Sequence, residues 1–245
     1  MRRVALVAFL AVSSPMSSGV AEADAQITGA RVPVVVELFS SEGCSSCPPA
    51  DALLARLDRD QPVAGAEVLA LEMHVDYWNQ LGWTDPFSQA AFSARQRAHA
   101  GAMGTRSIYT PQMIVDGRDE FVGSSALLAT RAIERTARAA HVAVKLERRG
   151  DDVAIDAGPA APSEGATRAM LAITERGLRT NVTAGENRGE TLAHGPVVRA
   201  LRAVGDLGPQ GLKATIAQPA RLGARVVVFV EGRDSLRVLG AATVD

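Results

Sequence analysis

The two cysteines of the chain, Cys44 and Cys47, form a single Cys-x-x-Cys motif between an apolar segment and a helical segment. Residues 32–39 are rich in β-branched side chains and predict a buried strand. Pro48 and Pro49 follow the motif, and proline is tolerated in a first helical turn, so a helix is expected to begin there. The sequence therefore predicts a cysteine pair where a strand ends and a helix begins.

This position favours redox chemistry over a structural role for the pair. A bridge between Cys44 and Cys47 closes a very short loop, which constrains the unfolded chain little. At the start of a helix, the amides of Ser46 and Cys47 and the helix dipole favour the thiolate form of Cys44. We therefore expect Cys44 to act as the nucleophile and Cys47 to resolve the mixed disulfide.

The segments around the motif predict an α/β unit over residues 26–140. A second strand after the first helix implies a parallel β-α-β crossover. The expected elements are a strand over residues 67–75, a helix over residues 85–100 with Asp85 as its N-cap, a strand over residues 112–117, a returning strand over residues 120–123, and a helix from Ser124 or Ser125 to about residue 139.

From residue 142 onward the pattern changes to short alternating runs separated by Gly, Pro and Asp. Several short strands at this spacing predict a small β-sandwich over residues 141–245. The expected runs cover residues 142–146, 153–157, 168–173, 197–203, 211–216, 225–230 and 237–243.

The N-terminus has the pattern of a secretory signal peptide over residues 1–25. Arg2 and Arg3 precede a short apolar run, and Ala23-Asp24-Ala25 matches a small-x-small cleavage site. The alternative is an uncleaved membrane anchor, but the run is shorter than the roughly 18–20 residues that span a bilayer. We expect a protein exported to the bacterial periplasm or secreted, in an oxidising compartment, with no membrane association after cleavage.

The charge balance excludes some classes of partner. The formal net charge is −1, so no basic excess favours nucleic acid or an anionic membrane surface. The sequence contains no phosphate-binding Gly loop, zinc-protease helix or nucleophile-elbow Ser motif, and no cofactor is expected. The expected partners are protein thiols or disulfides, together with a redox partner that the sequence does not identify.

Four segments carry a family resemblance: residues 37–51, 74–87, 109–112 and 185–199. Together with the strand and helix order, they resemble the thioredoxin superfamily, and more closely a bacterial family of secreted thioredoxin-like proteins catalogued as a domain of unknown function. The resemblance implies a thioredoxin-like domain followed by a β-rich tail. It also implies that Thr110-Pro111, before the hairpin, is the cis-proline loop that shapes a groove for an extended partner.

Other side chains near the motif have two possible roles each. Glu37, if buried, has a raised pKa and accepts the proton of Cys47; otherwise it is a half-exposed acid paired with an arginine. Tyr77, Trp78 and Trp83 either line a substrate groove or form a small aromatic core.

Two further functions remain as alternatives to an oxidoreductase. In the first, Cys44, Cys47 and His74 bind a metal such as copper, although a structural histidine is the commoner role. In the second, the disulfide is inert and the protein is a non-catalytic binding module. On the helix over residues 85–100, Arg95, Arg97 and His99 are expected to form a solvated face.

Overall fold

The structure is a computed structural model that describes residues 31–217 and 224–244. The predicted signal peptide lies outside the described residues. The N-terminal part contains β1 (Val32–Ser40), α1 (Pro48–Asp60), β2 (Ala66–His74), α2 (Ala90–Met103), β3 (Gln112–Val115), β4 (Asp119–Val122) and α3 (Ala126–Thr136). The C-terminal part contains β5 (Val144–Arg149), β6 (Asp152–Ala157), β7 (Thr167–Glu175), β8 (Arg179–Asn181), β9 (Thr191–Ala193), β10 (Val197–Asp206), β11 (Leu212–Ala217), β12 (Ala224–Gly232) and β13 (Val238–Val244).

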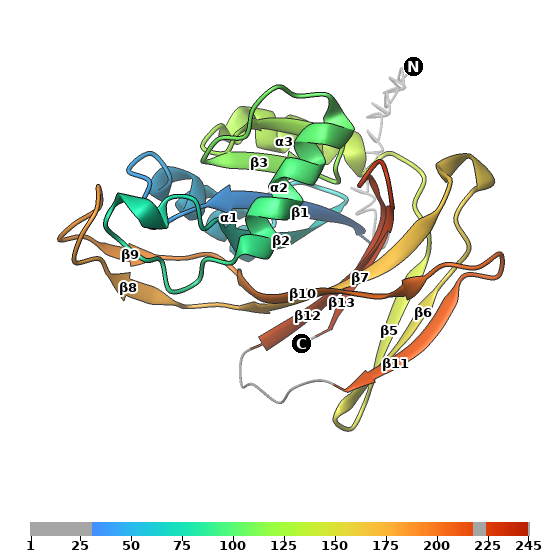
Figure 1. Ribbon diagram of the computed structural model, residues 1–245. Helices are drawn as coiled ribbons and strands as arrows, with labels where there is room; N and C mark the ends of the chain where they lie inside the picture. Colours follow the sequence, from blue (N-terminus) through green and yellow to red (C-terminus); the bar gives the residue numbers. More distant parts are fainter. Residues whose placement is uncertain (1–30, 218–223, 245) are drawn as a thin grey trace, which may run out of the picture.

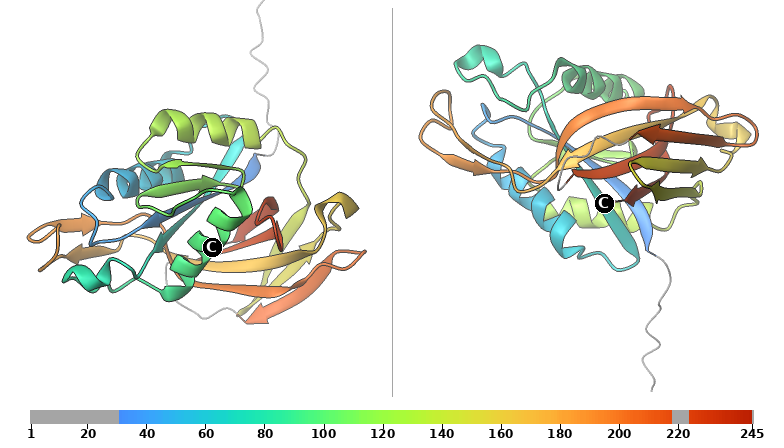
Figure 2. Two further views of the ribbon diagram at one scale, coloured as in Figure 1. Left: turned by 45° about the horizontal axis from the view of Figure 1, so that its top comes forward. Right: turned by 90° about the horizontal axis from the view of Figure 1, so that it is seen from below.

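These elements form a mixed α/β fold around one eight-stranded sheet, in the order β13-β12-β7-β10-β2-β1-β3-β4 (Figure 1). β1 and β2 are parallel, as the sequence predicts, and β3 runs antiparallel to β1. The predicted hairpin is confirmed as β3 and β4. α1 and α3 cover one face of this half of the sheet and α2 covers the other (Figure 2).

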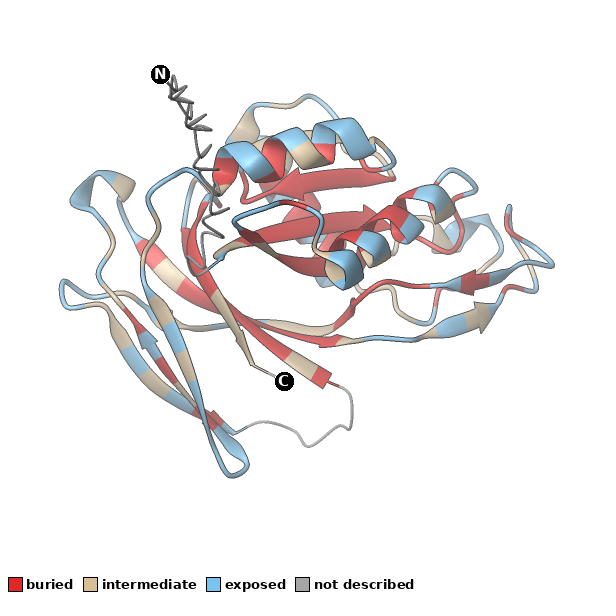
Figure 3. Cartoon of the chain, turned by 180° about the vertical axis from the view of Figure 1, so that it is seen from behind, coloured by how far each residue is buried: buried red, intermediate tan, exposed pale blue. Residues whose placement is uncertain are grey.

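The core follows from the composition of the central strands. β1 has both faces covered, so it is a continuous apolar run, buried from Val34 onward (Figure 3). Val34, Val36 and Leu38 face α1 and α3. Val35 and Phe39 face the α2 side. The end of β1, which leads into the cysteine loop, is therefore packed on both faces.

The C-terminal strands extend this sheet rather than forming a sandwich of their own. The two parts meet where β10 pairs with β2 through Val197 and Glu72, and the Glu72 amide donates to the Pro196 carbonyl at 2.9 Å. We call this junction the seam. β5, β6 and β11 form a separate three-stranded sheet that packs on β7 and β12, opposite the α2 side. The expected stacking of two sheets is present, but one of them is shared with the α/β part.

Helix α2 differs from the prediction in its start and in its exposed face. It begins at Ala90, because the side chain of Asp85 hydrogen-bonds His74 and the amide of Phe87 instead of capping a helix there. Arg95 and His99, predicted to be solvated, are buried. No helix of the described residues is long and apolar enough to span a membrane.

Arg95 and His99 of α2 belong to a charge network that we call the arginine network: Glu37, Arg95, His99, Arg168 and Glu231. Arg95 donates to Glu37 of β1 and, at 2.8 Å, to Glu231 of β12. Arg168 of β7 donates to the same Glu231 at 2.7 Å. The network therefore connects α2 to strands from both parts of the fold.

Candidate functional site

Cys44 and Cys47 form a disulfide in the loop between β1 and α1, with their Cα atoms 5.5 Å apart. α1 begins at Pro48, directly after the motif, as predicted. The Cys47 amide donates to the Cys44 carbonyl at 3.1 Å, rather than to the sulfur as the sequence analysis expects. The Cys44 sulfur instead lies 3.3 Å from the Ser46 hydroxyl.

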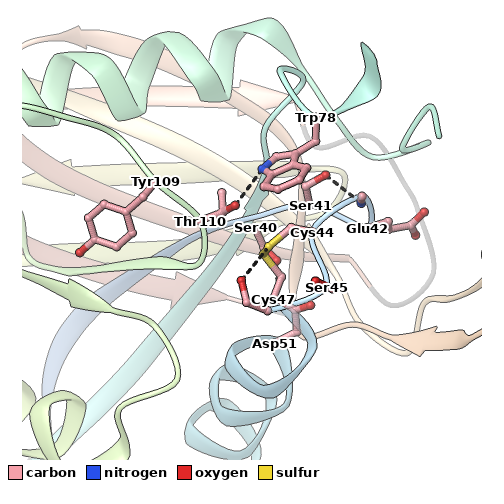
Figure 4. The surroundings of a disulfide bond; sticks show 12 residues. Ser40, Ser41, Glu42, Cys44, Ser45, Cys47, Asp51, Trp78, Tyr109 and Thr110 are labelled. Atoms are coloured by element: carbon pink, nitrogen blue, oxygen red, sulfur yellow. Dashed lines mark hydrogen bonds between the residues drawn. A yellow bond between two sulfur atoms is a disulfide. The ribbon is translucent and has the colours of Figure 1, made fainter. Parts of the chain in front are cut away.

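The disulfide is covered by protein. Both cysteines are fully buried, although Ser45 and Ser46 between them are exposed. The indole of Trp78 lies over the sulfurs (Figure 4). A Cβ atom on Gly43 would lie 3.2 Å from the Trp78 Cβ, so glycine lets the loop approach the indole closely.

The proline loop is hydrogen-bonded to the same indole. The Thr110–Pro111 peptide bond is cis, which confirms that expectation. The Trp78 indole N–H donates to the Thr110 hydroxyl at 2.8 Å (Figure 4). A Cβ on Gly123 would meet both Pro111 and Ala50, at 3.3 and 3.2 Å, so the proline packs close to the first turn of α1.

The other two aromatic residues do not line the disulfide in the way that Trp78 does. The Tyr77 hydroxyl donates to Gln96 of α2 at 3.1 Å, and its ring packs against the core on that side. The Trp83 indole donates to the Glu42 carboxylate at 2.7 Å, and the Glu42 side chain points away from the sulfurs (Figure 4). The structure therefore brings only Trp78 of the three over the disulfide.

Glu37 is buried, but its pKa is lowered rather than raised. Burial by itself works to raise this pKa, but the Arg95 guanidinium and the His99 ring outweigh it and hold the pKa at about 2. Both carboxylate oxygens are bound, one by Arg95 and the other by His99 at 2.9 Å. Glu37 is thus an ion-paired carboxylate and does not fit the expected role of proton acceptor.

A different buried acid, Asp51, has the raised pKa that was expected of Glu37. It lies on α1 four residues after Cys47, and its amide donates to the Cys47 carbonyl at 3.1 Å. Burial, reinforced by the charge of Glu72, raises the pKa of Asp51 to about 8. The Ser40 hydroxyl donates to its carboxyl group. The sequence signal that identifies it is the helical spacing from Cys47.

A second group of buried titratable side chains lies beside the cysteine loop. We call it the histidine cluster: Glu42, Glu72, His74, Asp85 and His194. His74 Nδ1 lies 2.6 Å from Asp85 Oδ2, and its Nε2 lies 2.9 Å from Glu72 Oε1. His194 Nδ1 lies 3.3 Å from the same Glu72 oxygen, and its Nε2 lies 3.0 Å from Glu42 Oε1. Because the Glu42 amide donates to Asp85 at 2.9 Å, these contacts close a ring.

The members of this cluster shift one another's pKa values. Burial works to lower the pKa of His194, but Glu42 and Glu72 raise it to about 9. Burial works in the same direction on His74, and Asp85 and Glu72 raise its pKa well above the usual value. The two rings in turn overcome the effect of burial on Glu72 and lower its pKa to about 2.

In this structure His74 does not form the alternative metal-binding set with Cys44 and Cys47. Its two ring nitrogens face Asp85 and Glu72, and the two cysteines bond to each other. His194 joins His74 through their shared contact with Glu72, and no local pattern predicts it because 122 residues separate His194 from Glu72.

The C-terminal part also contacts the cysteine loop directly. The loop between β8 and β9 carries Asn187, whose amide group donates to the Glu42 and Cys44 carbonyls at 2.8 and 3.1 Å. Glu186 of the same loop accepts from the Ser45 amide at 3.0 Å. The cysteine loop is therefore positioned by segments from both parts of the chain.

This arrangement defines a class of protein: a mixed α/β fold that carries a buried disulfide at a strand–helix junction. Residues 35–231 match the family described as Protein of unknown function (DUF1223), and the chain belongs to that family. A search of curated proteins found no match.

Two solved structures are similar to this chain. Protein AGR_C_4864 from Agrobacterium tumefaciens is 30% identical, with a TM-score of 0.69; the match covers 87% of this chain and 94% of that one. HBP35 of Porphyromonas gingivalis is 15% identical, with a TM-score of 0.59; the match covers 87% of this chain and 75% of that one. The second likeness concerns the fold alone.

Proposed function

We propose that the protein is a thioredoxin-like thiol–disulfide oxidoreductase that acts on protein or small-molecule thiols. The observation that carries the proposal is the Cys44–Cys47 disulfide at the start of α1, close to the cis-proline loop of Thr110 and Pro111. The predicted signal peptide supports an exported, periplasmic or secreted enzyme, where a disulfide persists.

The reaction is a two-electron exchange. A substrate thiolate attacks the Cys44 sulfur, the Cys44–Cys47 bond breaks, and Cys47 leaves as a thiolate that takes up a proton. A second substrate thiolate then attacks the mixed disulfide at the substrate sulfur and releases Cys44. The substrate dithiol becomes a disulfide and the protein gains two thiols. The reverse direction uses the same steps in the opposite order.

Asp51 is the group proposed to exchange a proton with Cys47. Its raised pKa, about 8, keeps the carboxyl protonated at neutral pH, so it can donate when Cys47 leaves. In the reverse direction its carboxylate accepts the Cys47 proton. The helical spacing places the acid one turn beyond the resolving cysteine (Figure 4).

The covered disulfide implies a movement before exchange. Trp78 lies over the sulfurs and is held by Thr110. We propose that a partner chain displaces the indole, and that the loop of Thr110 and Pro111 then receives the partner's extended backbone.

The test is to trap the mixed disulfide. Reduced Cys47→Ser protein is incubated with a disulfide substrate such as oxidised glutathione and analysed by mass spectrometry. The expected result is one adduct on Cys44, with insulin-disulfide reduction present in the wild type and absent in Cys44→Ser. No adduct and no catalysis by folded protein would contradict the proposal.

The burial of both sulfurs favours one rival function, a binding module with an inert disulfide. In that case the Cys44→Ser/Cys47→Ser double variant retains the biological effect. The wild-type disulfide then also resists dithiothreitol until the protein unfolds. An oxidoreductase loses its effect in the double variant and is reduced while folded.

A further inference from the structure

The histidine cluster contains three donor atoms that converge on one point. Glu72 and His74 are two residues apart on β2, so their side chains lie on the same side of the strand. His194 comes from the segment that leads into β10, across the seam. The donor atoms of the three residues lie within 4.8 Å of one another.

We propose that Glu72, His74 and His194 bind a divalent transition-metal ion of the Zn²⁺ class. This site differs from a set made with the cysteines, and the inference holds whether or not the disulfide exchanges.

The spacing of the donor atoms fits such an ion. Around a tetrahedral Zn²⁺ with bonds of about 2.0–2.1 Å, ligand atoms lie about 3.3 Å apart. His194 Nδ1 and His74 Nε2 lie 3.3 and 2.9 Å from Glu72 Oε1. The two ring nitrogens lie within 4.8 Å of each other, so side-chain shifts of at most about 1.5 Å bring all three pairs to this spacing.

The remaining polar atoms of the three side chains, which face away from this point, already have hydrogen-bond partners. Metal-binding residues in proteins usually have such partners. The outer nitrogen of His74 binds Asp85, and the outer nitrogen of His194 binds Glu42. The second oxygen of Glu72 accepts the Gly195 amide. Metal-binding histidines usually donate their outer N–H to a carboxylate, because this fixes the tautomer with its lone pair toward the metal.

The charge of the cluster also favours a cation. Three buried carboxylates, those of Glu42, Glu72 and Asp85, surround two imidazole rings. With neutral rings a divalent ion compensates most of this charge. Alternatively, one proton on each ring compensates the carboxylate charge, and Zn²⁺ titration distinguishes the two cases.

A pocket borders the site on the side of His194. An open pocket of about 590 Å³ lies between α1 and the segment before β10, and His194 and Gly195 line it together with Asp58 and Arg176. The His194 side chain itself is only 1% exposed, so an ion that enters from this pocket must displace the side chains around the ring.

The donor set selects the class of ion. Two imidazole nitrogens and one carboxylate oxygen suit Zn²⁺ and its neighbours, whereas Ca²⁺ and Mg²⁺ prefer sets of oxygen ligands. The protein offers three ligands and leaves a fourth position to water or a further ligand.

The experiment measures Zn²⁺ binding to oxidised wild-type protein, in which the disulfide removes the cysteines as ligands. Titration in competition with a chromophoric chelator is expected to give one Zn²⁺ per chain, with no comparable Mg²⁺ binding. His194→Ala and Glu72→Gln are each expected to weaken binding by about 100-fold or more. His141→Ala, which changes a histidine outside the cluster, is the matched control and is expected to bind as the wild type does.

X-ray absorption of the Zn²⁺-loaded wild type tests the site without relying on variants that fail to fold. The expected first shell has two imidazoles, oxygen and no sulfur. No stoichiometric binding, binding unchanged in both variants, or a shell without imidazole would each overturn the proposal and leave two ring protons as the source of charge balance.

Discussion

Two buried charge networks connect the N-terminal part of the fold to the C-terminal strands, and they use different cations. In the arginine network, Arg95 lies between Glu37 and Glu231. In the histidine cluster, His74 and His194 flank Glu72 at the seam. A guanidinium stays charged at every pH at which the protein folds, whereas an imidazole exchanges protons or binds metals. The arginine network is therefore a permanent connection, and the histidine cluster is one that responds to the solution.

The largest expected effect comes from breaking the permanent connection. Arg95→Met leaves Glu37 and Glu231 buried with only part of their charge compensated, so the free energy of unfolding should fall by about 3–5 kcal/mol. Arg97→Met, on the exposed side of the same helix, should change it by about 0.5 kcal/mol or less. Urea denaturation measures both. Similar small losses in the two variants would show that the network contributes little.

A second test sharpens the comparison through pH. His194 has a folded pKa of about 9 against an ordinary value of 6.5, so its stabilising contribution is complete below pH 6.5 and is lost as pH rises through 9. The loss is roughly 3 kcal/mol, at about 1.4 kcal/mol per unit of pKa shift. In metal-free buffer, His194→Gln should therefore lose less stability than the wild type between pH 6 and pH 9.5. Equal losses would contradict the assignment.

The arginine network predicts the opposite change, a loss of stability at acid pH. Glu37 has a folded pKa of about 2, so its contribution is present above pH 4.5 and is lost as pH falls through 2. Glu37→Gln should flatten the acid limb and leave the alkaline limb unchanged. Denaturant titrations between pH 2 and pH 5 measure this.

The sequence predicts the local elements because their signals are local. The β-branched run of β1, the prolines that open α1 and the Thr110–Pro111 loop are each visible within a few residues, and the structure has all three. The seven expected C-terminal runs also correspond to strands of the structure, with bounds that differ by a few residues.

The continuity of the sheet and the charge networks depend on long-range contacts, and the sequence does not reveal them. One residue pair, Val197 and Glu72, joins β10 to β2. Charged and apolar residues are spread around α2, so its pattern does not reveal that Arg95 faces the core. The sign of the Glu37 pKa shift follows from its contacts with Arg95 and His99, which the sequence does not reveal. The position of Asp51, in contrast, could be predicted from its helical spacing from Cys47.

The smallest expected effect concerns the rate at which the disulfide is reduced, which depends on Trp78 and not on either charge network. Trp78→Phe keeps an aromatic ring over the disulfide but removes the N–H that binds Thr110. A lost hydrogen bond of about 1 kcal/mol should raise the rate of disulfide reduction by dithiothreitol about fivefold. Thr110→Val should give the same increase in rate. The Trp78→Phe/Thr110→Val double variant should give no further increase, because both substitutions remove the same hydrogen bond. Trp83→Phe, whose indole binds Glu42, is the control; an equal increase there would contradict the role of Trp78.

The most direct test of the proposed function is the equilibrium reduction potential of the Cys44–Cys47 pair in glutathione buffers. Disulfides of thiol–disulfide oxidoreductases have potentials between about −270 and −120 mV, whereas structural disulfides in secreted proteins lie below about −300 mV. We predict a value within the first range, reached from both the oxidised and the reduced protein. A pair that stays oxidised in all glutathione buffers, with a potential below about −300 mV, would contradict the proposal.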